Sequence, residues 1–404
     1  MRLPGRTSVA IVAIVAIGVM TCAALLPAPL PALPAPPGKD ETPRRIPGTE
    51  QVHVDLVLID LVVRDRNDQP VTGLTRDDFD LIIDGVAVKP ADIESFEEVC
   101  GAQEPSALPA RTAGAPGSTP LPEPAAAAPA GVRHIVIYFD FTHMTTGAAR
   151  LAMRGAKDYL ARSLAPEDRV MILADSNGLR LVQDFTSDGP ALIARIDTLL
   201  EDKGIVATDV MGEDRYIVEV KETPCNDLDC SSRRAISAAY AGQEEMRGRR
   251  TLDYLTSLMP ALAGMKGRKA LVLFTEALRM EPGAQYYALT DATPREEGYL
   301  LERELLRLAS EANAAGVSFY TVHAGGLTAD LEPTRPTRLS GPKQSGVDSA
   351  HDLQITLATE TGGRALRNSN DVGAILGTAE RDLSCYYLLG YRYQGRGDNK
   401  RHSI

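Results

Sequence analysis

The sequence predicts an α/β protein in which a doubly wound, mainly parallel sheet is preceded by a small β module. Three observations lead to this fold class. Apolar runs rich in β-branched residues alternate with stretches of helical periodicity, which is the pattern of strands buried on both faces of a parallel sheet. Residues 51–100 contain shorter strand-like segments with turn signals. Residues 101–131, rich in Pro, Ala, Gly and Ser, are typical of a linker between two domains.

The N-terminal segment predicts export. Arg2 and Arg6 precede an uncharged stretch at residues 7–26 that is dominated by Val, Ile and Ala. We interpret residues 1–28 as a cleaved signal peptide or an uncleaved membrane anchor. Cys22 leaves a lipoprotein open, although the residues before it match a lipobox poorly. The chain is therefore expected to be secreted, periplasmic or anchored to the cell envelope.

A Pro-rich tether at residues 29–50 is expected to lead into the small β module, residues 51–100. Residues 52–63 alternate and then become continuously apolar, which predicts a half-buried strand. Residues 81–88 predict a hairpin whose type I′ turn is Asp84-Gly85. Residues 93–99 predict one more strand.

The main domain is expected to span residues 132–395. Its predicted strands lie at residues 135–139, 169–174, 178–183, 269–274, 317–322, 363–366 and 386–393. We place the last of these strands in the main sheet. Residues 396–404 then form either a frayed tail or a truncated final strand that leaves a sheet edge open to partners.

Helices are predicted between these strands. Thr145 or Thr146 caps the first and Asp188 caps the second. The predicted helices cover residues 145–163, 188–200, 235–263, 295–315, 352–361 and 372–383. The helix at 235–263 is expected to split near Gly248 and Pro260, because both residue types interrupt helices. Residues 203–234 have weak periodicity and are interpreted as an insertion.

Composition and net charge restrict the class of partner that the chain is expected to bind. The chain has 404 residues, 44% of them hydrophobic, as in globular proteins. Its formal net charge of −11 argues against nucleic acid or an anionic membrane as the main partner. We therefore expect an unidentified protein partner, with membrane contact only through the N-terminal segment.

The candidate site begins where the first main-domain strand ends. Asp140 terminates this apolar strand and Thr142 follows two residues later. In open α/β sheets, ligands bind outside the carboxyl ends of the strands. The segment resembles the first strand and metal loop of a von Willebrand factor type A domain, which has the pattern D-x-S-x-S. There the Asp and both hydroxyls hold a divalent cation.

The resemblance implies a degenerate metal site built from Asp140, Thr142 and Glu276, which would bind Mg²⁺ or Mn²⁺ weakly. Met144 occupies the second hydroxyl position, and its thioether does not suit Mg²⁺. Glu276 stands where the family has the Asp of T-D-G. A further Thr ligand would be Thr186 or Thr208. The alternative is that Asp140 only caps the next helix.

A second stretch carries a more specific resemblance. Residues 71–85, V-T-G-L-T-R-D-D-F-D-L-I-I-D-G, resemble the leader module of bacterial "VWFA-related" exported proteins, best known from acidobacteria. In that family the module precedes a type A domain. The similarity extends from about residue 52 to the chain end. It implies a fold and an exported location, but the family has no generally assigned activity.

Cysteine spacing predicts disulfides. Cys225 and Cys230 enclose four residues and favour a local bridge. Cys100 and Cys385 would then tie the N-terminal region to the late sheet. A zinc site is the alternative, although no close His or second cysteine pair supports it.

No G-x-S-x-G, Walker or H-E-x-x-H sequence occurs. We therefore favour a non-enzymatic protein-binding or adhesion module whose rim includes Asp140, Thr142, His143 and Glu276. His143 and His323 both end strands and are candidates for a metal or acid–base pair. One alternative is a phosphatase-like hydrolase with Asp140 as nucleophile, as in haloacid-dehalogenase-like enzymes with D-x-D-x-T. Another is a purely structural envelope protein.

Overall fold

A computed structural model describes most of the chain, and the described residues belong to one compact unit, Val54–Ile404. They are residues 55–89, 92–100, 132–176, 178–202, 212–226, 229–290, 301–327 and 342–393. The predicted leader, tether, linker and C-terminal tail lie outside these ranges. Within the ranges, no helix combines the length and apolar character that a membrane crossing requires.

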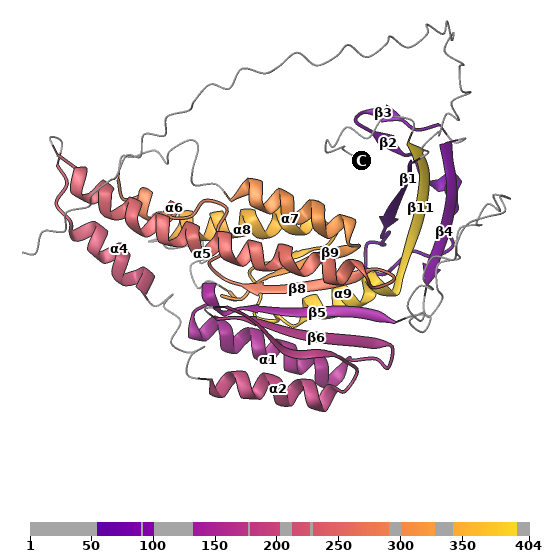
Figure 1. Ribbon diagram of the computed structural model, residues 1–404, viewed down its shortest axis with the longest axis horizontal. Helices are drawn as coiled ribbons and strands as arrows, with labels where there is room; N and C mark the ends of the chain where they lie inside the picture. Colours follow the sequence, from indigo (N-terminus) through magenta and orange to yellow (C-terminus); the bar gives the residue numbers. More distant parts are fainter. Residues whose placement is uncertain are drawn as a thin grey trace, which may run out of the picture. The chain divides into compact units, whose positions relative to one another are not determined.

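The main sheet has six strands, and its order confirms the predicted doubly wound α/β fold (Figure 1). From one edge to the other they are β10 (Ala365–Leu366), β9 (Val317–His323), β8 (Lys269–Thr275), β5 (Arg133–Asp140), β6 (Asp168–Asp175) and β7 (Leu179–Thr186). All neighbouring pairs are parallel except β6–β7. Because β5, β6, β8 and β9 run parallel, their carboxyl ends lie at one edge of the sheet, and the strand order reverses at β5.

Helices cover both faces of this sheet (Figure 1). One face packs against α1 (Thr146–Arg162), α2 (Gly189–Glu201) and α9 (Ala374–Ser384). The other packs against α5 (Ser231–Ala263), α7 (Glu302–Ala314) and α8 (Pro342–Glu360). Alternate residues of β5 enter the two cores, Ile137 on the first face and Val136 and Tyr138 on the second.

The predicted helix caps are confirmed. The Thr145 hydroxyl accepts a hydrogen bond from the Ala148 N–H at 3.2 Å. The Asp188 carboxylate accepts one from the Ala191 N–H at 3.0 Å. Each cap satisfies a backbone donor that the first helical turn leaves unpaired, a contribution of about 1 kcal/mol.

The predicted break in the helix at 235–263 is wrong, because α5 is continuous from Ser231 to Ala263. Gly248 serves packing instead, since a Cβ at this position would lie 2.5 Å from Leu301 Cδ1. Pro260 lies in the final turn and removes the N–H that would bond to the Thr256 carbonyl, yet the helix continues to Ala263. Gly and Pro do weaken helices, as the prediction assumed. In the folded chain, however, packing against other elements keeps α5 continuous.

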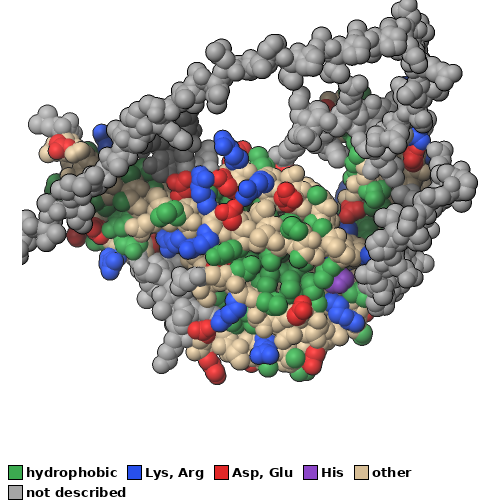
Figure 2. Space-filling model, in the orientation of Figure 1, with side chains coloured by type: hydrophobic (Ala, Val, Ile, Leu, Met, Phe, Trp, Pro, Cys, Tyr) green, Lys and Arg blue, Asp and Glu red, His purple; other side chains and the backbone are tan. Residues whose placement is uncertain are grey.

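Ion pairs join α5 to α7 on the outer surface. Arg249 contacts Glu304 at 2.7 Å, and Arg307 contacts Asp253 at 2.7 Å. Figure 2 shows positive and negative side chains mixed across this face of the molecule. Exposed pairs of this kind contribute little stability, but they keep the helix surface soluble.

The small β module is completed by the last strand described. β1 (Asp55–Leu61), β11 (Cys385–Tyr393) and β4 (Ile93–Cys100) form an antiparallel sheet with β11 in the middle. The assignment of residues 386–393 to the main sheet is therefore wrong. So is the expected open edge beside this strand, because β11 has a partner on each side.

The predicted hairpin in this module is present as β2 (Ile82–Ile83) and β3 (Val86–Ala87). Asp84 and Gly85 have φ values of 49° and 78°, as a type I′ turn requires. Its residues pack toward a small core that includes Leu389 of β11.

The module is fixed to the rest of the compact unit by charged contacts, and a disulfide joins two strands of its own sheet. Arg268 contacts Asp60 at 3.2 Å. Arg64 pairs with Asp382, a buried residue of α9. Cys100 and Cys385 face each other in the β4–β11 register and form a disulfide, which confirms the predicted pairing.

The predicted insertion at 203–234 contains more regular structure than expected. Residues 212–222 form α4 (Gly212–Glu222), which precedes α5. The predicted Cys225–Cys230 disulfide is confirmed, and it closes the turn between these two helices. Among the described residues, the one group with metal-ligand spacing is Glu98, Cys100 and Cys385, and its two sulfurs are already bonded to each other.

Candidate functional site

Four parallel strands of the main sheet end in polar residues at the same edge. These residues are Asp140 of β5, Asp175 of β6, Thr275 of β8 and His323 of β9. All four are buried. We call this edge, with the loops that follow the strands, the rim.

Asp140 is held inside the rim by two neighbours. Its side chain is fully buried, and both carboxylate oxygens lie 2.9 Å from Nδ1 of His143. The Thr275 hydroxyl donates to Oδ2 of Asp140 at 2.7 Å. Because an ionised carboxylate only accepts hydrogen bonds, Nδ1 of His143 carries the proton in this contact.

Thr142 turns away from Asp140 toward the next strand. Its hydroxyl donates to Oδ1 of Asp175 at 3.1 Å, and the Thr251 hydroxyl of α5 donates to Oδ2 at 2.9 Å. Burial, together with the nearby charge of Asp140, raises the pKa of Asp175. Two hydroxyl donors partly offset this desolvation.

Glu276 follows β8 and caps a helix instead of meeting Asp140. Its Oε2 accepts the Thr145 backbone N–H at 2.7 Å, at the start of α1. Burial raises the pKa of this carboxyl, and the Thr145 hydrogen bond opposes the shift. Met144, in the degenerate position of the motif, is 2% exposed and packs in the core between sheet and helices.

The three predicted metal ligands therefore share one rim, and each is bonded to a different protein group. A magnesium ion would compete with the hydrogen bonds of His143 and Thr275 for the Asp140 carboxylate. It would also have to separate Thr142 from Asp175. Weak cation binding stays a prediction.

Of the two further threonine candidates, Thr186 is wrong. It ends β7, which runs antiparallel, so it pairs with Val170 near the start of β6. This places it at the opposite end of the sheet from the rim. Thr208 lies outside the described residues.

His323 packs against a different histidine from the one expected. Its ring lies edge-on to the His351 ring, with centroids 4.7 Å apart. Nδ1 of His323 and Nε2 of His351 are buried without hydrogen-bond partners. Burial, with the neighbouring His351 and Arg279, lowers the pKa of His323 to about 4.

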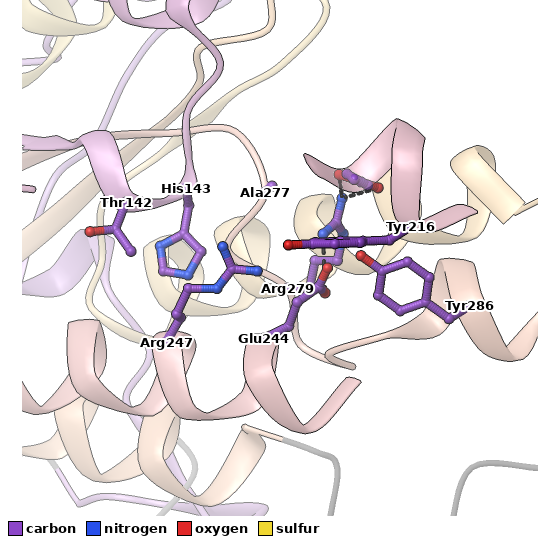
Figure 3. Close-up of a pocket in the computed structure, with 9 residues that line it drawn as sticks. Thr142, His143, Tyr216, Glu244, Arg247, Ala277, Arg279 and Tyr286 are labelled. Carbon is purple, nitrogen blue, oxygen red and sulfur yellow. Dashed lines mark hydrogen bonds and ion pairs between the residues drawn. The ribbon is translucent and has the colours of Figure 1, made fainter. Parts of the chain in front are cut away.

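A small polar pocket opens beside the rim (Figure 3). Its walls come from the loop after β5, from α4 and α5, from the segment after β8 and from α6 (Ala284–Tyr287). They are Thr142, His143, Glu213, Tyr216, Glu244, Arg247, Ala277, Arg279 and Tyr286. The enclosed space has room for about one water molecule.

Arg279 forms the floor of this pocket and ties the insertion to it. Its Nη2 lies 3.0 Å from both carboxylate oxygens of Glu213 on α4. Its Nη1 donates to Glu244 of α5 at 3.2 Å, and its Nε donates to the Gly346 carbonyl at 3.0 Å. This buried charge is thus matched by two carboxylates, as a buried ion must be.

Sequence reasoning missed several rim and pocket residues. Asp175 stands in register with Asp140 on the neighbouring strand, a position visible once both strands were predicted. Glu244, Arg247 and Thr251 recur at helical spacing, which places them on one face of α5. That spacing is visible in the sequence. However, the three side chains are charged or carry a hydroxyl group, so they form no hydrophobic pattern that would mark a buried helix face.

Comparisons with known proteins give similarities in structure only. No family model and no curated protein matches the sequence. An aerotolerance-related membrane protein from Bacteroides fragilis is 11% identical with a TM-score of 0.33, covering 62% of this chain and 98% of that one. The pilus adhesin SpaC from Lactobacillus rhamnosus GG, in its open conformation, is 12% identical with a TM-score of 0.34, covering 62% of this chain and 30% of that one.

The VWA domain of SpRpn10 is 11% identical with a TM-score of 0.24, covering 61% of this chain and 94% of that one. At such identities and TM-scores, these similarities carry no conclusion about activity or partner.

Proposed function

We propose that this chain is an exported or envelope-anchored, non-enzymatic module that binds a partner protein through the rim. The observation that carries the proposal is that the Asp140 carboxylate is buried and already hydrogen-bonded. A nucleophilic carboxylate must reach its substrate, whereas Asp140 is fully buried and bonded to His143 and Thr275. The partly exposed polar side chains of Glu213, Tyr216 and Arg247 lie instead at the pocket, where five separate segments meet.

Export rests on the N-terminal pattern and on the cysteines. An uncharged stretch after Arg2 and Arg6 resembles a signal or anchor segment. The two disulfides, Cys100–Cys385 and Cys225–Cys230, suit an oxidising compartment. The resemblance to VWFA-related exported proteins supports the same location.

Site-specific photo-crosslinking on the full chain tests the binding role. A photoreactive residue replaces Met246, which is 67% exposed on α5 and precedes Arg247 in the sequence. The matched control replaces Leu58, which is 50% exposed on β1 of the small module. With envelope extract from the source cells, we expect saturable adducts of discrete mass at Met246 and not at Leu58. Identical patterns at the two positions would contradict rim binding.

A phosphatase assay tests the hydrolase alternative separately. The full chain is incubated with aryl phosphates and Mg²⁺ or Mn²⁺, beside an Asp140→Asn variant. We expect no turnover above background in either protein. Metal-dependent turnover that disappears in the variant would establish the enzyme and overturn the proposal.

A further inference from the structure

Arg247 is the charged residue of the pocket lining that has no ion pair among the described residues. It lies on α5 between Glu244 and Thr251, and its guanidinium is directed into the same space as the His143 ring (Figure 3). Its Nε is buried without a hydrogen-bond partner. Within the described part of the chain, its guanidinium takes part in no ion pair closer than 4.0 Å.

The two carboxylates that line the pocket are both engaged elsewhere. Glu213 and Glu244 bind Arg279, and Glu244 also accepts the Gln285 side-chain amide at 2.6 Å and the Gly283 N–H at 3.1 Å. The pocket thus contains two guanidinium groups, and its acidic side chains serve only the deeper one.

A buried donor without a partner destabilises the folded chain, and a ligand that accepts from it removes this penalty. The guanidinium has five N–H donors in a planar fork that matches the two oxygens of a carboxylate. His143 lies on the same wall, but its Nδ1 donates to Asp140, so Nε2 of the neutral ring is an acceptor and adds no donor for an anion. The planar fork of Arg247 therefore carries the selection of an anionic, two-oxygen ligand.

We propose that Arg247 receives a single carboxylate, from an aspartate or glutamate side chain of the partner protein. This inference rests on the proposed function and names the chemistry of its partner. The enclosed space holds about one water molecule, so it admits a carboxylate at the end of a side chain and excludes a whole metabolite.

The test is a titration of the full chain with blocked tripeptides, followed by the ¹⁵N resonances of the arginine Nε–H groups. The probes are acetyl-Gly-Glu-Gly-amide and its Gln counterpart. The Arg247→Gln variant assigns the Arg247 resonance. Arg250→Gln removes the same charge from an exposed position on the same helix and is the matched control.

We expect the Glu peptide to shift the Arg247 resonance saturably and the Gln peptide to bind at least tenfold more weakly. Affinity should fall at least tenfold in Arg247→Gln, fall severalfold in Arg247→Lys, which keeps the charge without the fork, and stay unchanged in Arg250→Gln. Equal binding of the two peptides, or equal effects of the two Gln variants, would overturn the assignment. Acetate binding as tightly as the peptide would assign the site to free carboxylates instead.

Photo-crosslinking at Met246 in an Arg247→Gln background separates this inference from the proposed function. Loss of adducts that the Arg250→Gln background retains supports both. Adducts that persist in the Arg247→Gln background refute the carboxylate site while leaving rim binding intact. Absence of adducts in the unsubstituted chain refutes the proposed function, and the peptide titration then decides the Arg247 site independently.

Discussion

His143 occupies the position beside Asp140 that the type A resemblance would give to a cation. An imidazole N–H contacts both carboxylate oxygens there, so the protein supplies from its own loop the positive dipole that the acid requires. The residue lies in a 3-10 turn, η3 (Phe141–His143), that brings it back over the strand end. His143 thus covers the Asp140 carboxylate together with Thr275 of the neighbouring strand.

Replacement of His143 by Ala should therefore strengthen magnesium binding. The unsubstituted chain is expected to bind Mg²⁺ weakly, because its candidate ligands are bonded to protein groups. Release of Asp140 removes one charge-assisted hydrogen bond, which corresponds to about a tenfold to hundredfold gain in affinity. Titration calorimetry measures it, with His351→Ala as the control. Submicromolar binding by the unsubstituted chain would refute this account of the loop.

His323 should make the fold sensitive to acid. Its folded pKa of about 4 lies below the ordinary histidine value, so the unfolded chain takes up the proton first as pH falls. The stability contribution is complete above about pH 6.5 and declines as the pH falls toward 4. One such group gives a slope of up to about 1.4 kcal/mol per pH unit.

Urea unfolding at pH 7, 6 and 5 measures this effect in the unsubstituted chain and in His323→Asn. The variant should lose less stability over this interval, because the carboxyl groups that also titrate are common to both proteins. Parallel pH profiles in the two proteins would show that His323 does not contribute.

At the level of elements, the Cys225–Cys230 bridge determines where α4 lies relative to α5. It encloses a short loop, for which chain entropy predicts about 2 kcal/mol of stabilisation. A Cys225→Ser, Cys230→Ser chain should unfold at lower urea concentration, and α4 should become more susceptible to protease. Peptide mapping without reduction checks the bond itself. Two free thiols in protein recovered under oxidising conditions would contradict it.

The sequence predicted the positions of the helices and strands better than the contacts that these elements make with one another. β5, β6, β8 and β9 were identifiable because each combines an apolar run with a polar terminus. α5 was divided wrongly because Gly248 is a packing residue, which depends on Leu301, more than fifty positions away. In the site, Asp140 was found through a motif, whereas Arg247 becomes notable only when Glu213 and Glu244 are seen to bind Arg279.

At the scale of the whole molecule, β11 joins the two ends of the described chain in one sheet. Truncation after Ser384 should remove the central strand and unfold the small module, while the main sheet retains its two cores. Hydrogen exchange should then be fast throughout residues 55–100 and slow in β5 and β8. Continued protection of β1 and β4 would show that these strands do not depend on β11.

The central position of β11 also imposes an order on biogenesis. Synthesis produces β1 and β4 first, and Cys100 waits through 285 further positions for Cys385. During that interval the two strands have no backbone partner, and Cys100 remains open to oxidation or to pairing with the wrong thiol. A nascent chain released before β11 would expose unpaired strands together with a reactive sulfur. Cellular quality control could recognise both features as marks of an unfinished molecule.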